Sequence, residues 1–340
     1  MMILGIETSC DETAASVIEI DDNQVDINNF KNVPKLKIIS NLISTQIQTH
    51  QNFGGVIPEV ASRLHIENID NVIQIATEKV DINNIDCVAV SSNPGLIGAL
   101  LVGVNYAKSL AYALNKPLIS VNHIEAHICA NFIEHSNIQF PFICLVVSGG
   151  HTNLIKVDSP RDYTVLATTR DDAAGEAFDK ISRLLGLGYP GGPKIQEHAK
   201  QGNPYAYEFP KVSIPNSYDF SFSGVKTNII NALHKNPDMN KADIAASFQK
   251  AVVDVLAERT FNVANELNIK EIAIAGGVSA NQLLRKTFTE AAKINECNLY
   301  VPSLNFCTDN AAMVAARGYF EYIKGNFADL SLNASSVKMR

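Results

Sequence analysis

Tryptophan is absent from these 340 residues, and the six cysteines are scattered without forming a C-x-x-C pair. Cys87 and Cys144 lie in apolar, strand-like runs, so we expect them to be reduced residues of the core. Long uncharged apolar runs are also missing. The longest apolar helical stretch, residues 96–114, carries Asn105 and Lys108, which argues against a transmembrane span there.

The N-terminus lacks the basic, apolar and cleavage regions of a signal peptide and opens directly with a strand-like run. We therefore expect a cytoplasmic protein with no membrane association. A surplus of basic residues is missing too, because the net charge is −7. Composition thus argues mildly against nucleic acid as a partner, although a local groove could still bind RNA.

What is present indicates a folded globular protein of two ordinary domains, with 46% hydrophobic residues in a chain of 340. Expected strands cover residues 2–8, 14–20, 37–43, 86–91 and 117–121, and then 142–147, 152–157, 163–168, 271–275 and 298–301. Expected helices lie at about 58–79, 95–114, around 123–127, from 174, at 241–268, at 279–294 and from 308. Both halves of the chain show three strands followed by alternating helices and strands. This repeated order predicts an α/β fold of two related lobes.

Two segments interrupt this order. Residues 21–36 are rich in Asp and Asn and predict an excursion between strands. Residues 202–222 mix Pro, Gly and Asn with many aromatic side chains. Those aromatics could stack on splayed RNA bases, but packing in a satellite core is at least as good an interpretation.

Several glycine-rich turns could receive phosphate oxygens on exposed backbone N–H groups. Residues 5–13 and 146–152 each join two apolar strands, at equivalent places in the two halves. Gly276 and Gly277 leave a strand and would let a ligand approach closely, and Ser279 could cap the following helix. That segment matches neither the Rossmann nor the Walker pattern, so an ordinary tight turn stays the alternative.

An acidic segment opens the helix expected from residue 174. Asp171 and Asp172 would complement the helix dipole, and Asp179, deeper in the helix, could pair with Arg183. The turn at residues 186–193 that follows leaves room for a ligand against its backbone.

The segment His123-Ile-Glu-Ala-His127 places two imidazoles on one face of a helix, where they could grip one metal ion. Asp309 is a plausible third ligand, because it begins a helix just after a strand end. Two His and one carboxylate leave open positions and suit Zn²⁺ or Fe²⁺. Glu125 falls on another face than in the protease motif H-E-x-x-H, which argues against a peptidase, and we expect it to be solvated.

Eight motifs occur in the order found in one family. They are GIETSCDET (5–13), HIEAH (123–127), VSGGHT (147–152), DDAAGEAFDK (171–180), YPGGP (189–193), FSFSGVKT (220–227), AGGVSAN (275–281) and FCTDNAAM (306–313). Together they closely resemble the universal tRNA threonylcarbamoyladenosine transferase family in its bacterial form, over residues 2 to 325. Residues 21–36 look longer than the usual bacterial connection, and Gln196 stands where some relatives have an acid, so no ligand role is given to it.

The resemblance implies the actin/sugar-kinase/Hsp70-like fold, a duplicated βββαβαβα arrangement with its active site in the interlobe cleft. It divides the chain into an N-terminal lobe of residues 1–135, a C-terminal lobe of 136–325 with an insertion at about 195–235, and a tail of 326–340. The reaction implied is transfer of threonylcarbamoyl from threonylcarbamoyl-AMP to the exocyclic amine of the adenosine after the anticodon. The tRNAs concerned read codons that begin with A.

The resemblance also assigns residues. It makes His123, His127 and Asp309 the ligands of one divalent metal ion, with Fe²⁺ favoured and Zn²⁺ possible. No catalytic nucleophile or general base is assigned. The residues that it implies bind the adenylated substrate are Val146, Val147, Ser148, Gly149, Gly150, Asp179, Gly192 and Asn281.

Partners follow from the same resemblance: tRNA, a paralogous inactive partner of the same fold, and a small P-loop ATPase. Apolar positions on the helix at 58–79 are our expected contact surface for the paralogue. Two other functions fit the same fold. One is an ATP-dependent kinase or carbamoyltransferase, and the other is a nucleotide-switched binding module.

Overall fold

The computed structural model describes residues 1–21, 33–209 and 217–336, so the centres of the two interrupting segments lie outside the described residues. The chain forms two compact units. Unit 1 comprises Met1–Phe140, Asp158–Asp162 and the chain from Pro302 onward, and unit 2 comprises Pro141–Val157 and Tyr163–Val301. Each unit contains one five-stranded sheet.

The sheet of unit 1 has parallel strands on one side and antiparallel strands on the other. Its strands are, in spatial order, β3 (Lys35–Thr45), β2 (Glu12–Asp21), β1 (Met2–Glu7), β4 (Cys87–Asn93) and β5 (Leu118–Asn122). Strand β1 pairs antiparallel with β2 and parallel with β4, and β4 pairs parallel with β5. The carboxyl ends of β1, β4 and β5 therefore meet at one edge, where ligand groups collect in α/β folds.

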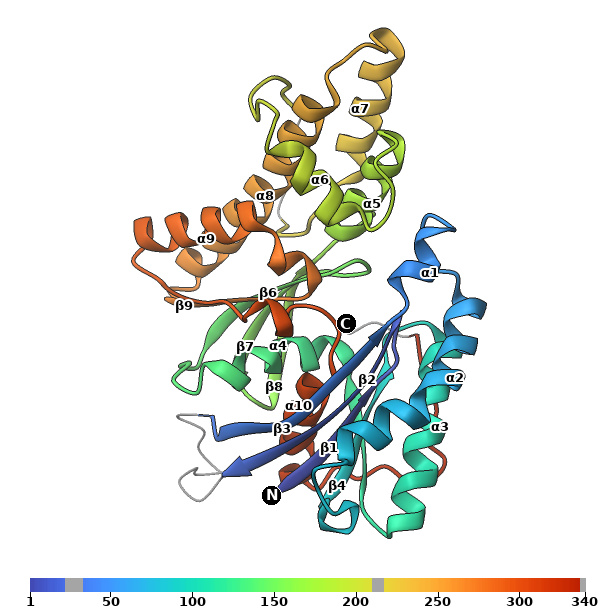
Figure 1. Cartoon of the computed structure of the whole chain (residues 1–340). Coiled ribbons are helices and arrows are strands. Elements are labelled where there is room, and N and C mark those ends of the chain that lie inside the picture. The colour runs from blue at the N-terminus through green and yellow to red at the C-terminus, as the bar shows by residue number, and fades with distance from the viewer. Residues whose placement is uncertain (22–32, 210–216, 337–340) are drawn as a thin grey trace. The chain divides into compact units, whose positions relative to one another are not determined.

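Helices cover both faces of this sheet (Figure 1). They are α1 (Ile47–Gln51), α2 (Pro58–Thr77), α3 (Ile97–Leu114), α4 (His123–Glu134) and α10 (Ala311–Lys324). Leu4 and Ile6 of β1 join the apolar cluster with α2 and α3. Because side chains alternate along a strand, Gly5 faces the other way, toward α10. Sheets buried on both faces need such uniformly apolar central strands.

Close packing of α10 depends on small residues. A Cβ on Gly5 would lie 2.3 Å from the carbonyl oxygen of Ala311, and a Cβ on Gly318 would lie 2.6 Å from the Cβ of Ala89. Any larger side chain at Gly5 would push the first turn of α10 away from β1. The glycine therefore fixes where the chain just before α10, which contains Asp309, is held.

Unit 2 repeats the sheet topology of unit 1. Its strands are, in spatial order, β10 (Asn298–Tyr300), β9 (Glu271–Ala275), β6 (Phe142–Val147), β7 (Thr152–Ser159) and β8 (Asp162–Thr168). Its helices are α5 (Ala174–Leu184), α6 (Gly191–Ala199), α7 (Ser223–Lys235), α8 (Lys241–Glu266) and α9 (Gln282–Ile294). As in unit 1, the first strand pairs antiparallel with the second and parallel with the fourth. The predicted duplication is thus confirmed, and the fold is α/β of the actin-like type.

The boundary between the units differs from the expected one. The sequence places residues 302–325 in the second lobe, whereas the structure groups α10 with unit 1. The reason is burial, because Tyr319 and Phe320 of α10 are fully buried and the helix packs on β1, β2, β4 and β5. Unit 1 is therefore built from both ends of the chain.

Helix α3 is, within the part of the chain that the structure describes, the one helix long and apolar enough to cross a membrane. In unit 1 it packs instead against β4 and α2, with Ala99, Leu100 and Val104 fully buried. Such a helix is common in the core of a folded domain. The two strand cysteines, Cys87 and Cys144, are fully buried free thiols, as expected.

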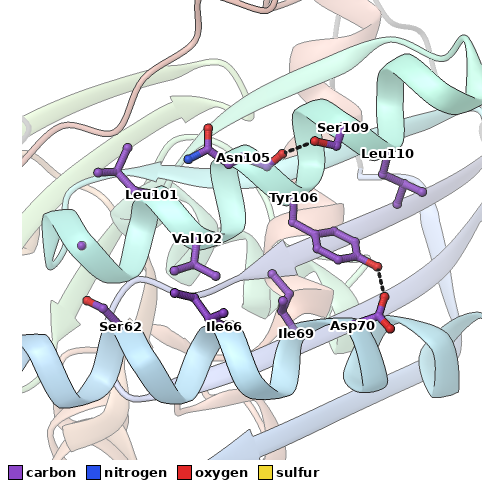
Figure 2. A pocket seen from close by; sticks show the side chains of 11 residues that line it. Ser62, Ile66, Ile69, Asp70, Leu101, Val102, Asn105, Tyr106, Ser109 and Leu110 are labelled. Atoms are coloured by element: carbon purple, nitrogen blue, oxygen red, sulfur yellow. Dashed lines mark hydrogen bonds between the residues drawn. The ribbon is translucent and has the colours of Figure 1, made fainter.

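The outer sides of α2 and α3 enclose a groove of about 810 Å³ (Figure 2). Its lining is mostly apolar and includes Ile66, Leu101 and Val102, while the hydroxyl of Tyr106 donates to Asp70 at 2.8 Å. Ile66 is 64% exposed. An apolar groove flanked by an exposed isoleucine of this size is typical of a contact surface for another protein.

Candidate functional site

The two helices that carry the expected metal ligands both begin at a well-capped N-terminus. Strand β5 ends at Asn122, whose side-chain oxygen accepts from the backbone N–H groups of Ile124 and Glu125. His123 is thus the first residue of α4, one turn before His127. Asp309 directly precedes Asn310, which caps α10 through the N–H of Met313 at 3.0 Å. His127 lies one turn inside α4 and Asp309 lies in the bend directly before the cap of α10, so the two caps hold the chain on either side of the expected ligands.

These three side chains converge within unit 1. Nε2 of His127 lies 3.1 Å from Oδ1 of Asp309, and Nε2 of His123 lies 3.5 Å from the same oxygen. One ligand atom from each residue lies within 4.8 Å of the others. The two imidazole rings meet edge to face, with centroids 4.6 Å apart. The predicted grouping of His123, His127 and Asp309 therefore exists in the structure.

The surroundings of the three ligands fit a divalent cation. Among the described residues, Nδ1 of the fully buried His127 has no hydrogen-bond partner, and its Nε2 faces Oδ1 of Asp309 at 3.1 Å without a hydrogen bond, although buried polar atoms normally form one. Acidic groups also gather nearby: burial, and then the charges of Asp11 and Asp309, raise the pKa of Glu12 well above its usual range. A cation held by two imidazoles and a carboxylate would satisfy the nitrogens and offset this negative charge.

A buried glutamate, Glu7, contacts the imidazole of His123. Oε2 of Glu7 lies 3.0 Å from Nδ1 of His123, the ring nitrogen on the far side from Asp309. Burial alone would lower the pKa of His123, but Glu7 and Asp309 raise it to about 9. Burial likewise opposes ionisation of Glu7, yet His123 holds the pKa of Glu7 below its usual value. The sequence analysis did not single out Glu7 among the acids of residues 5–13, although an acid closing an otherwise apolar buried strand was a usable signal.

Glu125 is not the solvated residue that the helix pattern predicts. Its carboxylate accepts from Nε of Arg317 on α10 at 2.6 Å, and the arginine side chain is only 4% exposed. Glu125 therefore ties α4 to α10, the two helices that flank the metal ligands. It plays no part at the ligand cluster, which agrees with the expectation that this is no peptidase motif.

In unit 2, the turn after β6 brings together part of the expected substrate surface. Val146 and Val147 close the strand and are fully buried. A Cβ on Gly149 or Gly150 would meet nothing within 4 Å, so both glycines border open space. A Cβ on Gly175 would lie 2.6 Å from the carbonyl oxygen of Ser148. The absence of a side chain at Gly175 therefore lets the turn pack closely against the start of α5. The result is a backbone-lined surface that a ligand can approach.

Asp179 of α5 contacts the start of α6, where Gly192 lies. Oδ1 of Asp179 accepts from the backbone N–H of Gly191 at 2.7 Å, and a Cβ on Gly192 would meet nothing within 4 Å. The N–H of Gly191 is taken by Asp179 and Pro193 has none, so the first turn of α6 offers the N–H of Gly192 beside open space, where an anion can receive it. The expected pairing of Asp179 with Arg183 stays a prediction beside this link to α6.

Asn281 caps α9, a role that the sequence assigned to Ser279. Its Oδ1 accepts from the N–H of Leu284 at 3.0 Å, and its Nδ2 donates to Gln249 at 2.9 Å. Ser279 lies instead in the short 3-10 turn Gly277–Ala280 that precedes the cap. Both ends of the Asn281 amide are engaged within the protein, so its part in substrate binding stays a prediction.

The described aromatic residues of the long second segment pack inward. Phe209, Phe220 and Phe222 belong to the apolar core of unit 2, which favours the satellite-core interpretation over base stacking for them. Tyr205 differs, since it is 78% exposed. Residues 210–216 of this segment lie outside the described residues.

Comparison with known proteins identifies close relatives. A family model described as tRNA N6-adenosine threonylcarbamoyltransferase matches residues 37–316. A protein of that name from Clostridioides difficile (strain 630) is 52% identical over 341 residues, covering 98% of this chain and 97% of the relative. Another from Clostridium kluyveri is 50% identical over 342 residues, covering 98% of this chain and 96% of the relative. These names favour the transferase over the kinase and the binding module.

Solved structures share the fold at low sequence identity. T. kodakarensis HypF superposes with a TM-score of 0.62 at 18% identity, over 97% of this chain and 49% of that one. Component A of Acidaminococcus fermentans (R)-2-hydroxyglutaryl-CoA dehydratase gives a TM-score of 0.54 at 14% identity, over 95% of this chain and 99% of that one. At such identities the likeness shows the common fold alone.

Proposed function

Because this chain belongs to the tRNA N6-adenosine threonylcarbamoyltransferase family, we propose that unit 1 binds the metal ion of that reaction and unit 2 binds the adenylated donor. The enzyme is a transferase that forms N6-threonylcarbamoyladenosine in tRNA. The observation that carries the metal proposal is the convergence of His123, His127 and Asp309. The open, glycine-lined turn after β6 supports the donor proposal.

The proposed donor is threonylcarbamoyl-AMP. The exocyclic amine of the adenosine after the anticodon attacks the carbamoyl carbon, a C–N bond forms, the C–O bond to AMP breaks, and the amine loses one proton. Because AMP is a good leaving group, positioning and charge stabilisation suffice without a covalent enzyme intermediate. We accordingly assign no nucleophile and no general base.

The chain's own groups orient the donor. Backbone N–H groups of Gly149 and Gly150, with that of Gly192, would hold its phosphate oxygens, while the N–H of Ser148 donates to the carbonyl oxygen of His151 at 2.8 Å and shapes the turn. Asp179 keeps the first turn of α6 in place through Gly191. A divalent ion on the two histidines and Asp309 would supply positive charge that orients and polarises the threonylcarbamoyl group. We propose Fe²⁺ for this role, with Zn²⁺ as the alternative, since both suit an N/N/O ligand set.

Replacement of one ligand tests this assignment. His127→Ala removes a fully buried imidazole, so we expect loss of bound metal and at least about a hundredfold loss of transfer. Metal content would be measured by elemental analysis, and transfer by nucleoside analysis of tRNA. His135→Ala, at the end of the same helix, is the matched control and should keep both properties. Full transfer by a metal-free His127→Ala enzyme would overturn the metal role.

We further propose that the groove between α2 and α3 receives a paralogous, inactive chain of the same fold. Exposed apolar side chains support this, since Ile66 is 64% exposed and Ile97 is 41% exposed beside the apolar lining. A partner helix with an apolar face would cover them. A small P-loop ATPase completes the proposed assembly, which works in the cytoplasm because tRNA is its substrate.

A charge in the groove should prevent this association. Ile66→Glu buries a carboxylate against apolar surface, so we expect the affinity for the paralogue to fall at least about tenfold. Size-exclusion chromatography or calorimetry of the two purified chains measures the loss. Ile294→Glu, on the 81% exposed isoleucine of α9, is the matched control. Equal binding by wild type and Ile66→Glu would place the partner elsewhere.

A further inference from the structure

Glu7 is the most completely enclosed carboxylate near the metal ligands. It is the last residue of β1 and has no exposed surface. Its Oε1 accepts from the backbone N–H of Ser9 at 2.5 Å, and its Oε2 accepts from the hydroxyl of Ser91 at 2.5 Å. The same Oε2 lies 3.0 Å from Nδ1 of His123. Three neighbours therefore hold the carboxylate in one orientation.

The sheet explains why these groups meet. Strands β1 and β4 are parallel, and the pairing of Ile6 with Val90 places their next residues, Glu7 and Ser91, side by side at the carboxyl edge. Strand β5 follows β4 at that edge and leads directly into His123. Backbone pairing thus positions Glu7, and no flexible loop is involved.

The two histidine ligands have different surroundings. Nδ1 of His123 faces both Glu7 and the hydroxyl of Ser9, which lies 3.2 Å away. His127 has no hydrogen-bond partner for either ring nitrogen among the residues that the structure describes. Burying a carboxylate costs free energy unless the carboxylate is paired. Glu7 is paired with one of the two histidines, His123, and this selective placement indicates a role beyond packing.

We propose that Glu7 is a positioning residue for the metal ion: it accepts the proton on Nδ1 of His123 and so directs the Nε2 lone pair toward the site shared with His127 and Asp309. Because the other ring nitrogen is fixed by this hydrogen bond, His123 has one tautomer and one ring orientation. The buried negative charge also makes the imidazole a stronger donor to a cation. Ser9 and Ser91 act through Glu7 by holding its rotamer.

The inference rests on the proposed metal site and is tested by metal affinity rather than by transfer. Glu7→Gln keeps the shape of the side chain and removes its charge. We expect the dissociation constant for Zn²⁺ or Fe²⁺, measured by chelator competition on the full chain, to rise about 10- to 100-fold. Ser91→Ala, which removes one hydrogen bond to the same oxygen, should give a smaller rise in the same direction.

Asp86→Asn is the matched control. Asp86, which directly precedes β4, accepts from the backbone N–H of Met2 at 2.7 Å, so the same carboxylate-to-amide change is made beside the opposite end of β1, away from the ligands. Its metal dissociation constant should stay within about twofold of wild type. An unchanged constant in Glu7→Gln, or an equal rise in Asp86→Asn, would overturn the role of Glu7. A wild-type chain that binds no metal would instead overturn the proposed site.

A second measurement needs no variant of Glu7. In the wild-type chain loaded with Zn²⁺ and labelled with ¹⁵N-histidine, long-range ¹H–¹⁵N spectra report which ring nitrogen carries the proton. We expect His123 to keep its proton on Nδ1 and to bind the metal through Nε2. Metal bound at Nδ1, or a His123 resonance unaffected by metal, would overturn the inference even if Glu7→Gln failed to fold.

Discussion

At the scale of single residues, Asp171 shows how one carboxylate can organise a distant segment. It accepts from the hydroxyls of Ser221 and Ser223 and from the backbone N–H of Phe222 at 2.8 Å. Burial opposes its ionisation, but these hydrogen bonds hold the pKa of Asp171 below its usual 3.8. Asp171 therefore joins the start of α5 to the start of α7.

This arrangement predicts an acid-dependent contribution to stability. A carboxylate whose pKa is lower in the folded chain stabilises the fold above its unfolded pKa, and the effect is lost as pH falls through the folded pKa. Asp171→Asn should lower Tm by about 1–3 °C at pH 7, a modest shift because the side chain is exposed. The difference from wild type should shrink below about pH 4 in calorimetric scans. A constant difference from pH 7 to pH 3 would contradict the assignment.

Residue identity alone did not reveal these partners. The sequence assigned Asp171 to the dipole of the next helix, because nothing in the local pattern points about fifty residues ahead to Ser221. The two histidines of the proposed metal site were predictable from sequence, because the i, i+4 spacing of His123 and His127 is a local pattern. Glu125 was misjudged because its partner Arg317 lies far along the chain.

At the scale of elements, the glycines of unit 2 fall into two physical classes. Gly149 borders open space, whereas Gly175 touches the backbone of Ser148. A side chain at the first should interfere only with a ligand, and one at the second should disturb the protein itself. Substitutions of Gly149 and Gly175 therefore distinguish an effect on ligand binding from an effect on stability at the turn after β6.

We predict opposite outcomes for the two alanine variants. Gly149→Ala should leave the free energy of unfolding unchanged and weaken binding of AMP by about 5- to 150-fold, since an intruding methyl group costs about 1–3 kcal/mol. Gly175→Ala should lower the free energy of unfolding by about 1–3 kcal/mol, because its Cβ would lie 2.6 Å from a carbonyl oxygen. Urea denaturation and calorimetry measure both quantities. Wild-type affinity for AMP in Gly149→Ala would exclude this turn from the donor site.

Most elements were predictable from periodicity because their apolar patterns are strong. The strand expected at residues 142–147 is β6 (Phe142–Val147), and the helix expected at 241–268 is α8 (Lys241–Glu266). Helix starts were less certain, since Ser279 and Asn281 are both good caps and only backbone geometry selects Asn281.

At the scale of the whole molecule, the grouping of α10 with unit 1 could not be read from sequence order. A chain that alternates strands and helices gives no sign that its last helix returns to the first sheet. The signal lies in close contacts, such as the one between Gly5 and Ala311. Residues after 301 are thus as much a part of the first sheet's domain as residues 1–140.

Truncation tests this grouping. A chain that ends at residue 301 loses α10, including the buried Tyr319 and Phe320, and exposes one face of β1. We expect unit 1 to unfold, because loss of the two fully buried aromatic side chains together with the buried aliphatic residues of α10 costs as much as the 5–15 kcal/mol that typically stabilises a domain. Limited proteolysis followed by mass spectrometry should find residues 1–140 digested first. Preferential digestion of residues 163–301 would contradict the grouping.

The proposed metal ligands also come from two distant parts of the chain, because His123 and His127 lie in residues 1–140 and Asp309 lies after residue 301. During synthesis the His123–His127 pair leaves the ribosome nearly two hundred residues before Asp309, about 10–40 s earlier at ordinary translation rates. An unfinished or C-terminally clipped chain thus carries both imidazoles without the carboxylate that completes the set. In the proposed site, acquisition of the metal is therefore coupled to completion of the polypeptide, because the full ligand set needs Asp309 held in place by the docked α10.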